Sequence, residues 1–186
     1  MPFFKKPLAG PGYIILNVIR AMNIIGLFAV IVASFSMLVK TFIVSKFFFF
    51  DAVSHIITAS LSMFLIITET PLFRTYILHS WPLLSPSHGF VTLGILMTVV
   101  GVSVLGNLNK EATSQKSLGV SYWRIVISSG IVVVILGVAN IFASYIFRQR
   151  KLGVTARQVR AYGAVAAQKA LAHARHHDVH ARDEYP

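Results

Sequence analysis

The sequence predicts an all-α integral membrane protein, a bundle of four transmembrane helices followed by a basic tail. Hydrophobic residues make up 55% of the 186 residues, and charged residues make up only 12%. Four long apolar stretches are separated by short polar segments, at about residues 14–39, 47–67, 90–108 and 122–147. Each stretch can cross the hydrocarbon layer of a bilayer, roughly 30 Å thick, for which about 20 apolar residues are enough.

Helices are expected rather than strands because lipid leaves each backbone amide with no hydrogen-bond partner outside its own helix. Segment 130–139 is apolar on every side, whereas the strands of a transmembrane β-barrel alternate in polarity. We therefore divide the chain into a cytosolic N-terminal segment (1–12), a four-span domain (13–147) and a basic cytosolic tail (148–186).

The first stretch is predicted to be a retained signal anchor. Lys5 and Lys6 precede it, but its apolar run is too long for a signal-peptide core, and no small-residue cleavage site follows. Asn17, Arg20 and Asn23 are spaced three residues apart, so a helix places them on one side. That side is expected to face the interior of the bundle.

The second stretch carries a polar stripe. Within about 100° of arc on a helix of 3.6 residues per turn lie six polar residues, namely Asp51, Ser54, His55, Thr58, Ser62 and Glu69. Ionisable groups in the membrane cost at least about 2.5 kcal/mol at mid-depth, so they face the interior and have partners. From their expected depths we predict two interhelical ion pairs. The first joins Arg20 to Glu69, and the second joins Asp51 to Arg124.

The third and fourth stretches carry small residues at helical spacing. Gly94 and Gly101 share a face of the third, and Gly130 and Gly137 lie along one side of the fourth. Small residues allow helix backbones to approach closely, which drives association in lipid. These glycines are predicted to be helix-packing residues, with the partner left open between another span and another protein.

Basic residues predict the orientation. With four spans, twelve of the 17 Lys and Arg residues lie on the side of the termini and five lie opposite, so both termini are expected in the cytosol. Arg148, Arg150 and Lys151 directly follow the last span and are predicted to contact anionic lipid headgroups of the cytosolic leaflet. Tyr76 and Trp81, in the segment between the second and third stretches, suit the same headgroup layer. Part of the tail, from residue 154 to about 177, is rich in helix-forming residues.

The sequence contains little that indicates catalysis. The chain has no cysteine and only six acidic residues, and it contains no Gly-rich phosphate loop, HExxH or Gly-x-Ser-x-Gly motif. No catalytic residue, metal site or cofactor is therefore expected. Nucleic-acid binding is not expected either, because no aromatic residues interleave the basic ones. Two alternatives remain open: a small channel or proton-coupled transporter that uses Asp51 and His55, and a lipid-modifying membrane enzyme that uses the same two residues.

The layout resembles that of a group of small fungal four-span membrane proteins, including MARVEL-type and COPI-associated Golgi proteins. The resemblance covers residues 13–148 and rests on four spans with cytosolic termini, the aromatic run Phe47–Phe50 and segment 81–106. It implies a location in the eukaryotic plasma membrane or the Golgi and other endomembranes, and it implies no catalytic residues. We expect a non-enzymatic membrane-organising or accessory scaffold protein that binds lipid and acts as a homo-oligomer or as a subunit of a larger membrane complex.

Overall fold

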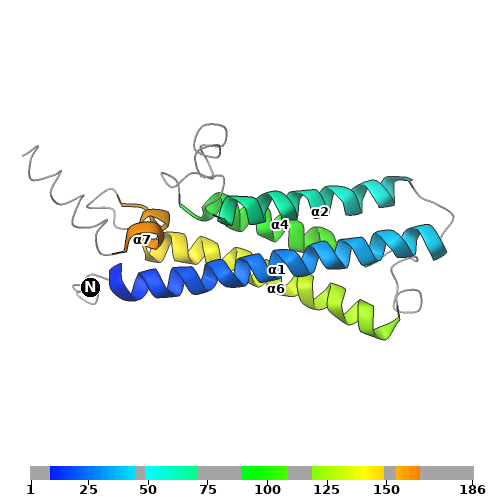
Figure 1. The fold of residues 1–186 in the computed structure, drawn as a ribbon, viewed down its shortest axis with the longest axis horizontal. Helices are drawn as coiled ribbons and strands as arrows, with labels where there is room; N and C mark the ends of the chain where they lie inside the picture. Colours follow the sequence, from blue (N-terminus) through cyan, green and yellow to red (C-terminus); the bar gives the residue numbers. More distant parts are fainter. Residues whose placement is uncertain (1–8, 45–48, 71–88, 109–118, 149–153, 164–186) are drawn as a thin grey trace, which may run out of the picture.

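The computed structural model describes residues 9–44, 49–70, 89–108, 119–148 and 154–163. Within these ranges the chain is all-α (Figure 1). The helices are α1 (Ala9–Val44), α2 (Phe49–Glu69), α4 (Val91–Asn107), α6 (Val120–Ile146) and the short α7 (Ala156–Tyr162).

Three of the helices are long and apolar enough to cross a membrane, namely α2, α6 and segment Gly12–Ile43 of α1. The fourth apolar helix, α4, is shorter at 17 residues. At 1.5 Å per residue, the 36 residues of α1 extend over about 54 Å, well beyond the hydrocarbon layer. Helices of this length and composition indicate an integral multi-pass membrane protein.

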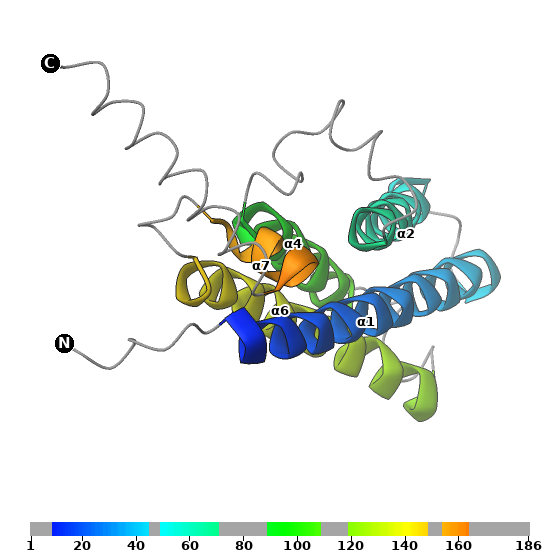
Figure 2. The same cartoon turned by 60° about the vertical axis from the view of Figure 1, so that its left-hand side comes forward.

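The four apolar helices run alternately up and down, so that α1 begins, α2 ends, α4 begins and α6 ends at the same end of the bundle (Figures 1 and 2). Helix α7 lies across that end, which we call the α7 end. At the other end, the first turns of α6 diverge from α2, and α1 runs between them (Figures 1 and 2).

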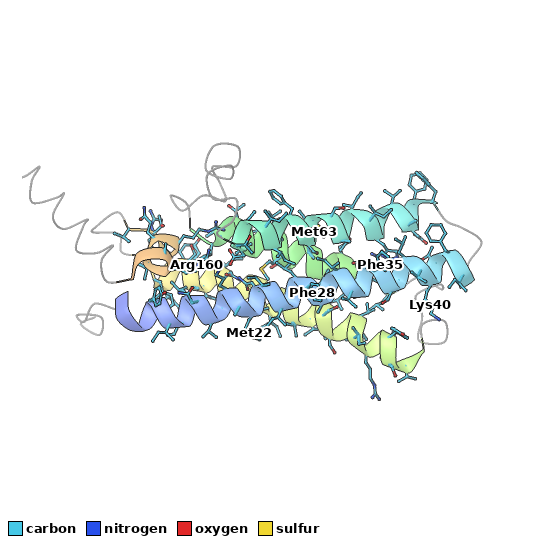
Figure 3. All side chains as sticks on the ribbon, viewed as in Figure 1. Met22, Phe28, Phe35, Lys40, Met63 and Arg160 are labelled. Carbon is cyan, nitrogen blue, oxygen red and sulfur yellow. The ribbon has the colours of Figure 1, made fainter. Side chains whose placement is uncertain are left out.

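Helix α4 packs most extensively on α6, and α1 packs on both α2 and α6. Their shared core includes Leu27, Val30, Met97, Val100 and Val133, all fully buried. Large apolar side chains also cover the outside of the bundle. Met22, Phe28 and Phe35 of α1 and Met63 of α2 are exposed, and Figure 3 labels them. Such extensive apolar exposure is rare on soluble proteins and fits a surface covered by lipid.

Candidate functional site

Helices α4 and α6 approach each other closely. A Cβ atom on Gly94 would lie 2.5 Å from the carbonyl oxygen of Gly137, and one on Gly101 would lie 2.8 Å from the carbonyl oxygen of Gly130. Real Cβ atoms do not approach backbone atoms this closely, so the two helices meet backbone to backbone. The structure thus brings the four glycines together within one chain.

Two buried amides join α1 to α6. The Nδ2 group of Asn23 donates to Oδ1 of Asn140 over 3.1 Å, and Nδ2 of Asn140 donates to Oδ1 of Asn23 over 2.9 Å. Asn140 also donates to the carbonyl oxygen of Leu136, one turn earlier in its own helix. Both amides are buried, so this reciprocal pair fixes the position of α1 against α6 in an apolar interior.

A second set of polar side chains joins α2 to α4. Asn107 Nδ2 donates to Ser54 Oγ over 3.3 Å, and the hydroxyls of Thr58 and Ser103 lie 3.4 Å apart. These distances are at the long end for hydrogen bonds, and each contact is correspondingly weak. We call Ser54, Thr58, Ser103 and Asn107 the polar seam, since they line the contact between the two helices.

Glu69 and Arg160 form an ion pair at the α7 end. Glu69 is the last residue of α2 and is only 1% exposed. Arg160, on α7, donates from Nη1 to Glu69 Oε2 over 2.6 Å. Figure 3 shows Arg160 at this end of the bundle. A short charge-assisted hydrogen bond is among the stronger kinds, so it ties the tail helix to the end of α2.

Phe90 lies beneath both arginines of α7. The guanidinium carbon of Arg160 lies 4.7 Å from the centre of the Phe90 ring, and that of Arg157 lies 5.3 Å from it. Both distances fall within the range of cation–π attraction. Arg157 is 4% exposed, and its burial lowers its pKa to about 10. The Glu69 carboxylate opposes this shift, and the Arg160 guanidinium adds to it. We call Glu69, Phe90, Arg157 and Arg160 the tail cluster.

Local sequence explains why α7 begins where it does. The side chain of Thr155 accepts a hydrogen bond from the backbone N–H of Gln158, and the Gln158 side chain accepts one from the backbone N–H of Thr155. This capping box satisfies two amide groups that the first turn of a helix leaves free. The helix ends at Gly163, whose φ of 54° favours glycine.

Apolar side chains complete the contact between α7 and the bundle. Val154, Ala156 and Val159 are buried in the same cluster as Leu16 of α1 and Phe147, which follows α6. Helix α7 therefore covers the end of the bundle with an apolar surface as well as with the ion pair.

The beginning of α4 is held by α6. The backbone N–H of Phe90, directly before α4, donates to Ser144 Oγ over 3.0 Å. Phe90 is almost fully buried. This bond fixes the ring on which both arginines lie, because it anchors the backbone that carries the ring.

Neither predicted ion pair forms between the described residues. Glu69 pairs with Arg160 in place of Arg20, which is half-buried on α1. The α1 side chain that contacts Arg160 is that of Asn17, one turn before Arg20. Its Nδ2 group donates to the backbone oxygen of Arg160 over 3.4 Å.

Arg124 is exposed in the first turns of α6, which diverge from α2 (Figure 1), and among the described residues it forms no ion pair with Asp51. Asp51 is half-buried, and His55, one turn later on α2, is fully buried. The described residues contain no group of three or more His, Cys, Asp or Glu side chains that could hold a metal ion.

Of the predicted headgroup contacts, Arg148 lies just after α6 and is exposed. The others lie outside the described residues: Tyr76, Trp81, Arg150 and Lys151.

Sequence reasoning did not single out Phe90, Arg157 or Arg160. Arg157 and Arg160 counted only as charges of the tail, and Phe90 only as the start of an apolar stretch. One signal was present: Thr155 and Gln158 have the spacing of a capping box, which marks the start of a helix with both arginines in its first two turns.

Comparison with known proteins gives a family. No curated protein and no solved structure is significantly similar to this chain. The model of the family described as a domain of unknown function, DUF7598, matches residues 12–146, a range that contains nearly all of the four apolar helices and ends before α7. Because the match covers more than half of the 186 residues, the chain belongs to the DUF7598 family.

Proposed function

We propose that this protein is a four-span, non-enzymatic membrane protein that organises its membrane or serves as an accessory subunit of a larger membrane complex. It acts through helix contacts and through contact of its basic tail with anionic lipids of the cytosolic leaflet. In this proposal α4 also crosses the membrane, as the third of the four spans, since an apolar helix of 17 residues is near the lower limit for crossing a bilayer and α4 packs along α6. Both termini, and with them the α7 end, face the cytosol.

One observation carries the proposal: polar side chains inside the bundle bond to one another across helices. Asn23 bonds to Asn140, Asn107 bonds to Ser54, and Glu69 pairs with Arg160. Polar groups used in this way hold helices together in lipid. A solute path would instead direct them towards a water-filled passage. The resemblance of the layout to MARVEL-type and COPI-associated Golgi proteins supports the same role and an endomembrane or plasma-membrane location.

The test is the composition of the particle that the full chain forms in native membranes. Extraction in mild detergent, followed by native mass spectrometry, should give either an oligomer of this chain or a complex with one defined partner protein. A single chain without a protein partner would contradict the scaffold role.

A second measurement separates the scaffold from a transporter. Proteoliposomes that contain the chain should show no more proton flux than empty liposomes. Flux that Asp51→Asn or His55→Gln abolishes, with the fold retained, would replace the scaffold by a proton pathway.

A further inference from the structure

Helix α7 is too short to be stable by itself. It has seven residues, whereas an isolated helix in water needs about 12 to 15. Its capping box helps to start the helix, but tertiary contacts or a membrane surface must supply the rest of its stability. In the structure the bundle supplies them, through the tail cluster and the buried Val154, Ala156 and Val159.

The packing of α7 on the bundle, which we call docking, costs free energy because it desolvates charged groups. Arg157 and Arg160 come close together beneath α7, and only 4% of Arg157 is exposed. Burial lowers the pKa of Arg157 to about 10, because the charged guanidinium loses most of its contact with water. The desolvation of buried charges can cancel much of the attraction between them. Docking of α7 is therefore a balance of opposing contributions.

The basic and apolar residues of α7 also have the chemistry that binds an anionic membrane surface. In the orientation proposed above, the α7 end lies at the cytosolic leaflet, where anionic lipids attract each nearby basic residue by about 1 kcal/mol. Arginine binds phosphate with parallel hydrogen bonds, as it binds a carboxylate. Ala156 and Val159 would enter the headgroup layer as the apolar side of a surface helix, with Val154 just before it.

We propose that the arginine face of α7, formed by Arg157 and Arg160, is a binding element for anionic phospholipid headgroups. Glu69 holds this face on the bundle, and lipid phosphates compete with the Glu69 carboxylate for it. The inference rests on the orientation in the proposed function. Its consequence is a tail helix that moves from the bundle to the lipid surface as the anionic lipid content rises.

A cysteine pair can report the docked state, because the chain has no cysteine of its own. A Cβ atom on Gly12 would lie 3.5 Å from Val159 Cγ1, which is close to the spacing that a disulfide requires. Its nearest neighbour is the ring of Phe147 at 3.0 Å, a side chain that can turn. Gly12→Cys with Val159→Cys should therefore cross-link α7 to α1 only while α7 is docked.

The experiment compares the rate of cross-linking in bilayers of phosphatidylcholine and of phosphatidylserine. We expect efficient cross-linking in the neutral lipid and a several-fold slower rate in the anionic lipid. Salt should restore part of the rate, because it screens the attraction. Glu69→Gln should slow cross-linking already in the neutral lipid, while Lys40→Gln, which removes a charge from the other end of α1, should leave the lipid response unchanged.

Equal rates in the two lipids would overturn the proposal. If inorganic phosphate slows cross-linking in the neutral bilayer as much as phosphatidylserine does at equal ionic strength, the assignment to lipid is wrong. Should Glu69→Gln fail to fold, Arg160→Lys provides the second variant. It keeps the charge but replaces the guanidinium that bonds to Glu69 through Nη1, so it should slow cross-linking in the neutral lipid. These measurements use the reconstituted chain alone, so their failure is distinct from the absence of an oligomer or partner.

Discussion

Glu69 and Arg160 are 91 residues apart in the chain, and their side chains lie 2.6 Å apart at one end of the bundle. The pair joins the end of α2 to a helix that follows the last span. Residues 148–186 are thus not simply an appendage, because their described part, α7, shares the core of the bundle. The four-helix bundle and the beginning of its tail form one packed unit.

The two arginines of α7 should respond differently to substitution. Arg160→Met leaves the buried Glu69 carboxylate without its partner, which costs about 3 to 5 kcal/mol when both charges are buried and less here because Arg160 is partly exposed. Arg157→Met removes a desolvated charge together with its contact on the Phe90 ring and its attraction to Glu69, so it should weaken docking less than Arg160→Met does. Hydrogen exchange of the α7 amides in nanodiscs measures both effects. Equal acceleration in the two variants would contradict the assigned roles.

Close packing of α4 on α6 should tolerate no added methyl group. Gly94→Ala places a Cβ atom against the backbone of Gly137, so it should destabilise the bundle by about 1 to 3 kcal/mol or more. Gly106→Ala is the matched control on the same helix, since among the described residues nothing beyond its chain neighbours and its own helix backbone lies within 4 Å of the added Cβ. The control should be neutral or slightly stabilising, because alanine favours helix. Unfolding in bicelles compares the two, and equal stabilities would rule out a packing role.

Removal of the two buried amides should have unequal effects. Asn140→Leu leaves Asn23 without a hydrogen-bond partner among the described residues, whereas Asn23→Leu leaves Asn140 bonded to the Leu136 carbonyl oxygen. An unsatisfied buried group costs more than a lost bond, so Asn140→Leu should be the more destabilising change by about 0.5 to 1.5 kcal/mol. In a double-mutant cycle, the loss in the double variant should be smaller than the sum of the single losses. Additive losses would mean that the two amides do not interact.

The Ser144 hydroxyl should stabilise the start of α4. Ser144→Ala removes the acceptor of the Phe90 N–H, which should cost about 0.5 to 2 kcal/mol, as does the loss of a helix cap. Ser128→Ala, at an exposed position of the same helix, is the control and should have little effect. Faster exchange of the Phe90 amide in the first variant alone is the expected result. The same rate in both variants would show that the bond is not needed.

The helices could be predicted from the sequence because a backbone in lipid must satisfy its own hydrogen bonds, which an apolar stretch does by forming a helix. The described part of each predicted stretch lies on one helix, apart from the end residues Phe90, Leu108 and Phe147, and α1 extends five residues further at each end than residues 14–39. Pro11 lies in its first turn, where a helix tolerates proline. Helical spacing also identified the faces that carry Gly94 and Gly137, because small residues at helical spacing usually mark where two helix backbones approach closely.

Partners of the charged residues could not be predicted in the same way. Arg20 and Glu69 were matched by depth alone, but depth does not determine which side of a helix meets which neighbour. Glu69 also had a possible partner outside the four spans, because Arg160 belongs to the tail. Arg124 was matched to Asp51 by depth as well, but the first turns of α6 diverge from α2 (Figure 1).

Charge reversal at the tail cluster shows whether the ion pair docks the tail helix on the end of the bundle. The reporter is the disulfide between Gly12→Cys and Val159→Cys in neutral bilayers. Glu69→Arg alone and Arg160→Glu alone should each reduce cross-linking strongly, and the two changes together should restore it. Full cross-linking in either single variant would contradict the account, because α7 would then be docked without the pair.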